Sequence, residues 1–186
     1  MRTVRAADRQ EWREWLAEHH DTVGEIWLVL PTKAAGEESI SYNDAVEEAL
    51  CFGWIDSTNR SIDETHKVRR FTPRRPGSPY SQPNIERLRW LRDRGMLMPG
   101  VLASVSGIID EPFSFPEDIL SEIRGDACAW ANYQGLSESY KRIRIAYIDA
   151  ARKRPEEFRR RLDHFIRVTR RGGIIRGYGG VDKYYR

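Results

Sequence analysis

The sequence predicts an α+β fold, with a small β-sheet and flanking helices in the N-terminal half and a helical C-terminal subdomain. Two observations lead to this prediction. Short apolar runs typical of strands occur only in the N-terminal half. Beyond Pro99, apolar residues recur at the three- and four-residue spacing of helices. We therefore expect an α+β module over residues 1–97, a helical subdomain over 98–176 and a flexible tail over 177–186.

The first predicted helix follows Asp8, a residue type that caps helix N-termini. Trp12, Trp15, Leu16 and His19 then recur at helical spacing and define its buried face. The unbroken apolar run within Glu25–Pro31 predicts a strand that is covered on both faces. The predicted core includes four side chains from this half of the chain. They are Trp12, Trp15, Trp27 and Leu50.

The second predicted helix begins at a capping box formed by Ser41 and Asp44, and Gly53 ends it. Two short strands are expected next, at Trp54–Ser57 and Lys67–Thr72, joined by a polar stretch. This order of elements places the second helix directly before the strand pair.

A loop over residues 73–83 is predicted, because four prolines in that stretch exclude regular structure. Pro83 then begins a helix that Gly95 ends. The later segments are all expected to be helices. They are Val101–Ile109, one from Pro116, one capped by Asp126, Glu138–Arg154, and one from Pro155 to the Gly172–Gly173 pair.

The composition excludes a wholly disordered chain and a membrane-spanning segment. The 186 residues include six Trp, eight Tyr and six Phe, which are enough to fill a core. No apolar run approaches the ~18 residues that a membrane-spanning helix needs, and no signal-peptide segment follows Met1. We therefore expect a cytoplasmic protein that does not insert into membranes.

The cysteines and histidines indicate neither a disulfide framework nor a metal centre. Cys51 and Cys128 are too few for the first and match no zinc-binding spacing, and the four histidines are scattered. Beside Leu50 in a helix, Cys51 is expected to be a small buried apolar residue rather than a nucleophile. We expect reduced thiols, no metal and no cofactor. No nucleophile–base or paired-carboxylate set is visible, so no catalytic residue is predicted and enzymatic activity is left open.

The charge is distributed unevenly along the chain. Residues 1–138 hold 16 Lys and Arg against 23 Asp and Glu, a formal charge of −7, whereas residues 139–186 hold 15 against 5, a charge of +10. Such a basic C-terminal region indicates either a nucleic-acid contact or an internal electrostatic match. We expect most of these arginines to lie on solvated helix faces, with nucleic-acid binding as the less favoured alternative.

A ligand site is predicted around Asp56 and the proline-rich loop. A carboxylate among apolar neighbours needs a partner, and Arg70 or Arg74 is expected to supply it. Neighbouring residues of a strand point to opposite faces of the sheet, so Arg70 and Phe71 lie on different faces. If Phe71 faces the core, Arg70 is the expected partner of Asp56. Two interpretations of this pair stay open. It is either an ion pair with a purely structural role or the polar base of a ligand-binding pocket.

The same loop leads into a helix N-terminus, where unpaired N–H groups favour anions. Arg74, Ser78, Ser81 and Asn84 lie along this stretch, and arginine can bind a phosphate or carboxylate in a bidentate manner. We therefore predict a small-anion site there, with Arg74 contributing to binding rather than to stability.

Several sequence blocks occur together in a known family. Residues 49–56 read Ala-Leu-Cys-Phe-Gly-Trp-Ile-Asp, and residues 70–74 read Arg-Phe-Thr-Pro-Arg. The other matching positions are Trp12, Trp15, Leu16, Tyr42, Ser81, Asn84, Tyr147, Ile148, Ala151, Arg152, Arg161 and Leu162. In this combination the chain resembles the YdeI-like, OmpD-associated (OmdA, bacteriocin-protection) family. It departs from the family at residues 155–157, Pro-Glu-Glu, where a Thr-Arg pair is common.

The resemblance implies a bacterial protein associated with envelope stress and antimicrobial-peptide resistance, with no established reaction or cofactor. It adds Tyr42 to the predicted ligand-binding residues. We expect the protein to bind a small anionic ligand or a peptide. The alternative is a nucleic-acid-associated stress protein that binds through the basic C-terminal helices.

Overall fold

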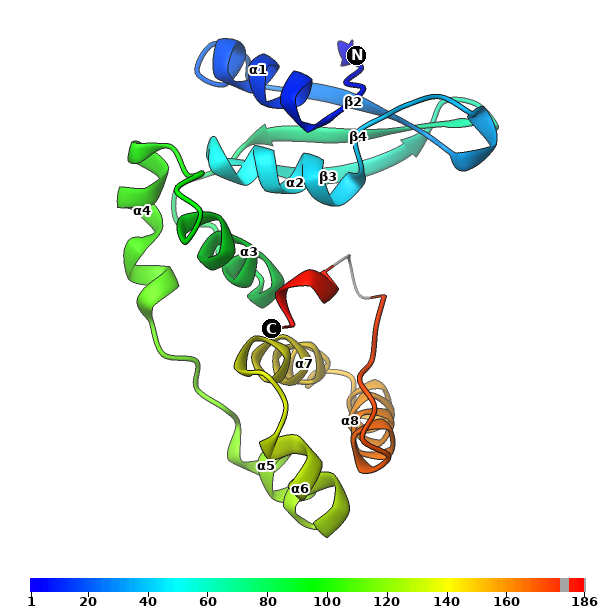
Figure 1. Cartoon of the computed structure of the whole chain (residues 1–186), viewed down its shortest axis with the longest axis vertical. Coiled ribbons are helices and arrows are strands. Elements are labelled where there is room, and N and C mark those ends of the chain that lie inside the picture. The colour runs from blue at the N-terminus through cyan, green and yellow to red at the C-terminus, as the bar shows by residue number, and fades with distance from the viewer. Residues whose placement is uncertain (178–180, 186) are drawn as a thin grey trace. The chain divides into compact units, whose positions relative to one another are not determined.

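The computed structural model describes residues 1–177 and 181–185, and it confirms the α+β prediction (Figure 1). The chain forms two compact units. The first consists of residues 1–79 and 88–107, and it contains the sheet. The second consists of residues 80–87 and 108–186, and its described elements are helical.

The sheet has four strands in the order β1-β2-β4-β3. The strands are β1 (Thr3–Val4), β2 (Ile26–Pro31), β3 (Trp54–Ser61) and β4 (His66–Pro73). Strand β1 is parallel to β2, and the other neighbours are antiparallel. Strand β3 runs further than predicted because its pairing with β4 resumes at Asn59, after a register shift that follows Asp56. The two-residue strand β1 was not predicted.

The two faces of the sheet have different neighbours. Phe71 lies on the face covered by helices α1 (Arg9–His19) and α2 (Tyr42–Cys51), with its ring 5.3 Å from the ring of Trp12. The indole N–H of Trp12 also donates to the carbonyl of Ala45 at 3.0 Å, which holds the two helices side by side. The opposite face carries a separate small cluster of buried side chains. These are Trp27, Val29 and Val68.

Helix α1 begins where predicted, because the Asp8 side chain accepts hydrogen bonds from the N–H groups of residues 10 and 11. Ser41 caps helix α2, since its hydroxyl oxygen accepts from the Asp44 N–H at 3.1 Å, and Gly53, with a φ of 73°, follows the end of this helix. Of the four predicted core residues, Trp12, Trp27 and Leu50 are buried. Trp15 is half-buried and stacks on the ring of Trp12 at 5.2 Å.

Two fully buried glutamates of α2 connect it to α1. Glu47 accepts from Arg9 at 2.8 Å, and Glu48 accepts from both Arg9 and, at 2.6 Å, Arg13. Buried carboxylates require such partners, because the free energy of burying an unpaired charge is strongly unfavourable. This ion cluster therefore fixes how the two helices pack. The first unit also contains the 3-10 helix η1 (Lys33–Ala35) and most of α4 (Pro99–Asp110).

The remaining helices begin close to the predicted residues. They are α3 (Gln82–Arg92), α5 (Glu117–Arg124), α6 (Ala127–Gln134), α7 (Glu138–Asp149), α8 (Pro155–Arg170) and the 3-10 helix η2 (Val181–Tyr184). Asp126 and Ser137 cap α6 and α7 as predicted, whereas α7 ends at Asp149 rather than Arg154. Helix η2 has buried Val181 and Tyr184 where we expected no regular structure, and Tyr178 lies outside the described residues.

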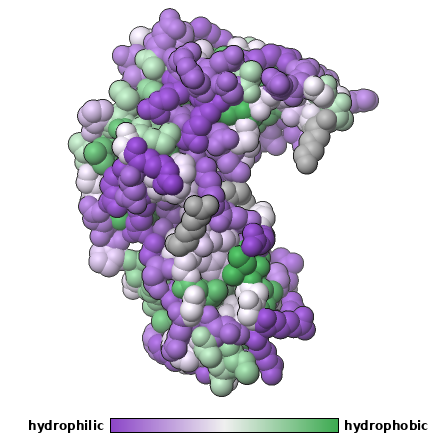
Figure 2. All heavy atoms as spheres, viewed as in Figure 1, coloured by the Kyte–Doolittle hydropathy of each residue, from purple (hydrophilic) through white to green (hydrophobic). Residues whose placement is uncertain are grey.

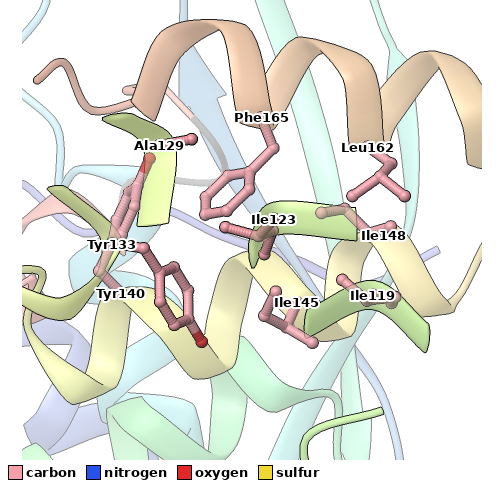
Figure 3. Close-up of a cluster of buried hydrophobic side chains, with 9 residues drawn as sticks. All are labelled: Ile119, Ile123, Ala129, Tyr133, Tyr140, Ile145, Ile148, Leu162 and Phe165. Atoms are coloured by element: carbon pink, nitrogen blue, oxygen red, sulfur yellow. The ribbon is translucent and has the colours of Figure 1, made fainter. Parts of the chain in front are cut away.

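The core of the second unit lies among α5, α6, α7 and α8 (Figure 3). The ring of Phe165 lies 6.3 Å from that of Tyr133 and 6.2 Å from that of Tyr140. Isoleucines from α5 and α7 complete this cluster. On the face shown in Figure 2, hydrophilic residues cover most of the surface. Within the described part of the chain, we find no helix long and apolar enough to cross a membrane.

Candidate functional site

The structure brings together two of the predicted site residues, Tyr42 and Asp56. The Tyr42 hydroxyl donates to the Asp56 carboxylate at 2.8 Å. The third member of this group is Arg69, which is not among the residues predicted from the sequence. Its Nη1 lies 3.6 Å from the Asp56 carboxylate, and its guanidinium lies over the Tyr42 ring at 4.6 Å. A phenol from the start of α2 thus lies beside a carboxylate and a guanidinium of the sheet.

The prediction that Arg70 pairs with Asp56 is wrong. The Nε of Arg70 donates instead to Glu25 at 2.7 Å. Asp56 lies directly opposite Phe71, and cross-strand partners place their side chains on the same face. Arg69, two residues before Phe71, shares that face, whereas Arg70 lies on the other. Arg70 does lie on the face away from Phe71, as predicted. Asp56, which was expected on the same face as Arg70, lies on the face of Phe71 instead.

Arg74 is also not the partner of Asp56, and it holds the proline-rich loop together. Its Nη2 donates to the carbonyls of Ser78 and Pro79, both at 3.0 Å. In the second unit, the Ser81 carbonyl accepts from the Asn84 N–H at 2.9 Å, as expected where a helix begins. The Asn84 side-chain oxygen accepts from Arg87 at 2.9 Å. Anion binding by these loop residues stays a prediction.

Cys51 is not an activated nucleophile. Its side chain is fully buried, and burial raises the pKa of its thiol to about 12. A thiol with so high a pKa carries almost no thiolate near neutral pH. Cys51 and the exposed Cys128 are both free cysteines. Among the described residues, no three or more His, Cys, Asp or Glu side chains are grouped so that they could hold a metal ion.

Many arginines of the basic C-terminal region pair with acidic residues of the same unit. Arg142 makes a bidentate contact with the buried Glu86, at 2.7 and 2.8 Å. Further pairs join Arg152 to Asp118, Arg159 to Glu122, Arg160 to Glu157, Arg161 to Glu157 and Arg170 to Asp126. These pairs support the internal electrostatic match that the charge distribution suggested.

A pocket of about 500 Å³ opens in the second unit, between α7, α8 and the segment at residues 175–177. We call it the α7–α8 pocket. Six of the side chains that line it are basic: Arg144, Arg160, Arg161, His164, Arg167 and Arg176. Four others are apolar or aromatic: Tyr147, Ile148, Phe165 and Ile175. None of the site residues predicted from the sequence lines this pocket.

The walls of the α7–α8 pocket are fixed by hydrogen bonds. The Ile175 N–H donates to the Tyr140 hydroxyl at 2.8 Å, and the Ile175 carbonyl accepts from the buried Arg144. Arg161 stacks on the Tyr147 ring at 3.7 Å and donates to the Tyr147 carbonyl at 2.6 Å. The pocket is therefore formed before any ligand binds, which lowers the entropy cost of binding.

The cations of the pocket differ in how they are neutralised. Arg160 donates to Glu157 at 2.8 Å, and Arg161 donates to the same carboxylate at 2.6 Å. Arg167 and Arg176 are exposed and have no ion-pair partner among the described residues. The pocket thus presents positive charge that the described part of the chain does not balance. Such charge favours a phosphate or carboxylate ligand.

One signal for this pocket was present in the sequence. Arg160, His164 and Arg167 recur at i, i+4 and i+7, so they lie along one face of α8. Arg176 could not be placed in the same way. It lies in a segment without periodicity, whose position depends on the hydrogen bonds of Ile175.

Two family models match the chain. Residues 4–104 match the model described as Domain of unknown function (DUF8412), and residues 112–172 match the model described as Bacteriocin-protection, YdeI or OmpD-Associated. No curated protein and no solved structure matches the chain. The second match confirms the expected family, and it covers α7 and α8 rather than the blocks at 49–56 and 70–74. The chain therefore belongs to the DUF8412 family through more than half of its length, and its helical second unit is similar to the YdeI/OmpD-associated, bacteriocin-protection family.

Proposed function

We propose that the protein binds a small anionic ligand in the α7–α8 pocket. The observation that carries the proposal is the pair of exposed arginines, Arg167 and Arg176, that line the pocket without a carboxylate partner in the described chain. Guanidinium groups bind phosphates and carboxylates with strong charge-assisted hydrogen bonds. A volume of about 500 Å³ is also typical of small-molecule sites.

Isothermal titration calorimetry with inorganic phosphate at low salt tests this proposal. We expect saturable binding to the wild-type protein. The double variant Arg167→Gln, Arg176→Gln removes both donors, and each charge-assisted hydrogen bond contributes about 1.5–3 kcal/mol. We therefore expect at least about a tenfold weaker affinity for phosphate in this variant.

Arg154→Gln provides the matched control. Arg154 is exposed in the same unit and lies outside the pocket lining, so its removal changes the net charge but not the site. We expect phosphate affinity close to that of the wild type. Equal losses in the control and in the pocket variants would mean that net charge alone attracts phosphate, and the proposal would be rejected.

The sequence-derived alternative, nucleic-acid binding through the basic helices, makes a different prediction. Oligonucleotide binding would weaken steeply with salt, with a slope of about −0.9 per phosphate contact for duplex DNA. The pairing of Arg142, Arg152 and Arg159 with carboxylates leaves less charge for such contacts. We expect no tight binding of arbitrary oligonucleotides at physiological salt.

The description of the second matching family also motivates a biological expectation. We propose that the protein contributes to protection against bacteriocins or related antimicrobial peptides, and that it acts in the cytoplasm. Bacterial survival during bacteriocin exposure tests the first point, with wild-type and Arg167→Gln, Arg176→Gln genes compared in a deletion strain. Cell fractionation tests the second.

A further inference from the structure

The α7–α8 pocket has two chemically different parts. Its cations lie on α8 and on the segment that follows it, and the exposed Arg167 and Arg176 belong to this part. Its accessible apolar surface comes from the half-buried Tyr147 and Ile175, whereas Ile148 and Phe165, also in the lining, are each only 1% exposed. Figure 3 shows Ile148 on α7 and Phe165 on α8, within the core cluster of the second unit. The lining residue Ile175 packs against this cluster, so the apolar part of the pocket adjoins that core.

An inorganic anion uses only the cationic part. Phosphate or sulfate bound at the arginines would leave water against Ile175 and the ring of Tyr147, where it finds few hydrogen-bond partners. Displacing such poorly bonded water with an apolar group is favourable, at roughly 25 cal/mol per Å² of apolar surface buried. The described pocket is therefore complementary to a ligand that carries both a charge and an apolar group.

The hydrogen bonds of the wall fix the relation between the two parts. The backbone of Ile175 is held at both its N–H and its carbonyl, and the next residue along the chain is Arg176. An apolar contact and an arginine are thereby held one residue apart on the same wall. A ligand with its apolar group close to its anionic group would reach both.

We propose that the ligand of this pocket is an amphiphilic anion, with one phosphate or carboxylate group bound by Arg167 and Arg176 and a compact aromatic or branched apolar group packed on Tyr147 and Ile175. This inference rests on the proposed anion-binding function and specifies its substrate class. Inorganic anions bind the same arginines but more weakly.

Three probes on the wild-type protein test the inference without any variant. They are inorganic phosphate, phenyl phosphate and phenol. We expect phenyl phosphate to bind at least about tenfold more tightly than inorganic phosphate, because the ring buries apolar surface that phosphate does not. Phenol, which lacks the anionic group, is expected to bind far more weakly than phenyl phosphate.

Isoleucine methyl NMR spectra locate the ring. Phenyl phosphate should shift the methyl signals of Ile175 upfield through the ring current, and inorganic phosphate should not. The variant Ile175→Ser should lower the ratio of phenyl phosphate to phosphate affinity, since it keeps the backbone bonds of residue 175 and removes the apolar contact. Ile62→Ser, in the first unit and exposed, is the matched control and should leave the ratio unchanged.

The outcomes separate the two proposals. Equal affinities for phosphate and phenyl phosphate, without methyl shifts, would overturn the amphiphilic ligand and leave anion binding intact. Binding of phenol as tight as that of phenyl phosphate would overturn both, because the arginines would then contribute nothing. Absence of saturable binding by phosphate and phenyl phosphate alike would also overturn both.

Discussion

Arg69 and Asp56 form an ion pair across strands β3 and β4, with 3.6 Å between the guanidinium Nη1 and the carboxylate. Both side chains are largely buried, at 22% and 15% exposure. The Tyr42 hydroxyl donates to the same carboxylate. This group connects the start of α2 to the sheet, so we expect it to contribute to folding stability.

Arg69→Ala should lower the free energy of unfolding by about 1–3 kcal/mol, because it leaves the Asp56 carboxylate partly unpaired in a largely buried position. Arg70→Ala is the matched control. It removes a more exposed pair with Glu25, and exposed ion pairs contribute little to folding stability. Urea denaturation of both variants measures the difference. A larger decrease in the free energy of unfolding for Arg70→Ala than for Arg69→Ala would contradict the finding that Arg69, and not Arg70, shares a face with Asp56.

Glu48→Gln should be among the more destabilising single changes in the first unit. Glu48 is fully buried and neutralises Arg9 and Arg13, whose side chains are 30% and 36% exposed. Because those arginines retain some hydration, we expect a loss of about 2–3 kcal/mol rather than the larger cost of a fully buried pair. Thermal and urea unfolding check this value, with the exposed Glu38→Gln as the control. If Glu48→Gln lowered the free energy of unfolding no more than Glu38→Gln does, the ion cluster between α1 and α2 would have no stabilising role.

His66 should give the first unit a pH-dependent stability. Its ring contacts Asp63 and Glu37, both at 3.0 Å, and hydrogen bonding to these carboxylates raises the pKa of His66 above its usual 6.5. A raised folded-state pKa means that the stabilisation is fully present below the unfolded-state pKa. It is lost as the pH rises through the folded-state pKa.

The pH dependence is measured on wild-type protein and His66→Gln. The difference in their unfolding midpoints should be largest below about pH 6 and should shrink as the pH rises above 7. NMR titration of the His66 ring protons reports the folded-state pKa directly. A pKa at or below that of an unstructured histidine would contradict the contact. Donation from the Thr65 N–H lowers the pKa of Asp63 to about 2. We therefore also expect the folding stability to fall at strong acidity, as the Asp63 carboxylate becomes protonated.

Trp27→Ala tests the smaller apolar cluster on the other face of the sheet. Trp27 is 5% exposed, its indole N–H donates to Glu25 at 2.8 Å, and Arg60 lies over its ring at 5.1 Å. Truncation of a buried tryptophan typically costs about 3–5 kcal/mol. We expect a loss near the lower value, because arginine side chains can partly refill the space. An unchanged urea midpoint would show that this face contributes nothing to the core.

Local signals predicted the helices well, and pairing between strands explains where the prediction failed. Asp8, Ser41 and Asp126 cap helices through bonds to residues two or three positions away, so their effect is visible in the sequence. The partner of Asp56 depends on the register of β3 against β4 and on the irregularity after Asp56. Alternation within one strand does not show which of its side chains share a face with a given residue of the neighbouring strand, because that depends on the register between the two strands.

The α7–α8 pocket was missed for a related reason. The arginines of α8 were visible as a basic helix, but their pairing with Glu157 and Glu122 was not. The wall at Ile175 is positioned by two residues of α7, Tyr140 and Arg144, more than thirty positions earlier in the chain. Long-range hydrogen bonds of this kind leave no periodic pattern.

Arginine side-chain NMR during a titration with inorganic phosphate tests the central proposal most directly. We predict saturable shifts of the Nε–H signals of Arg167 and Arg176, with the signal of Arg154 unchanged. Absence of a saturable shift at both pocket arginines would contradict anion binding in the α7–α8 pocket. A saturable shift confined to Arg74 would contradict it as well, and would place the anion in the proline-rich loop.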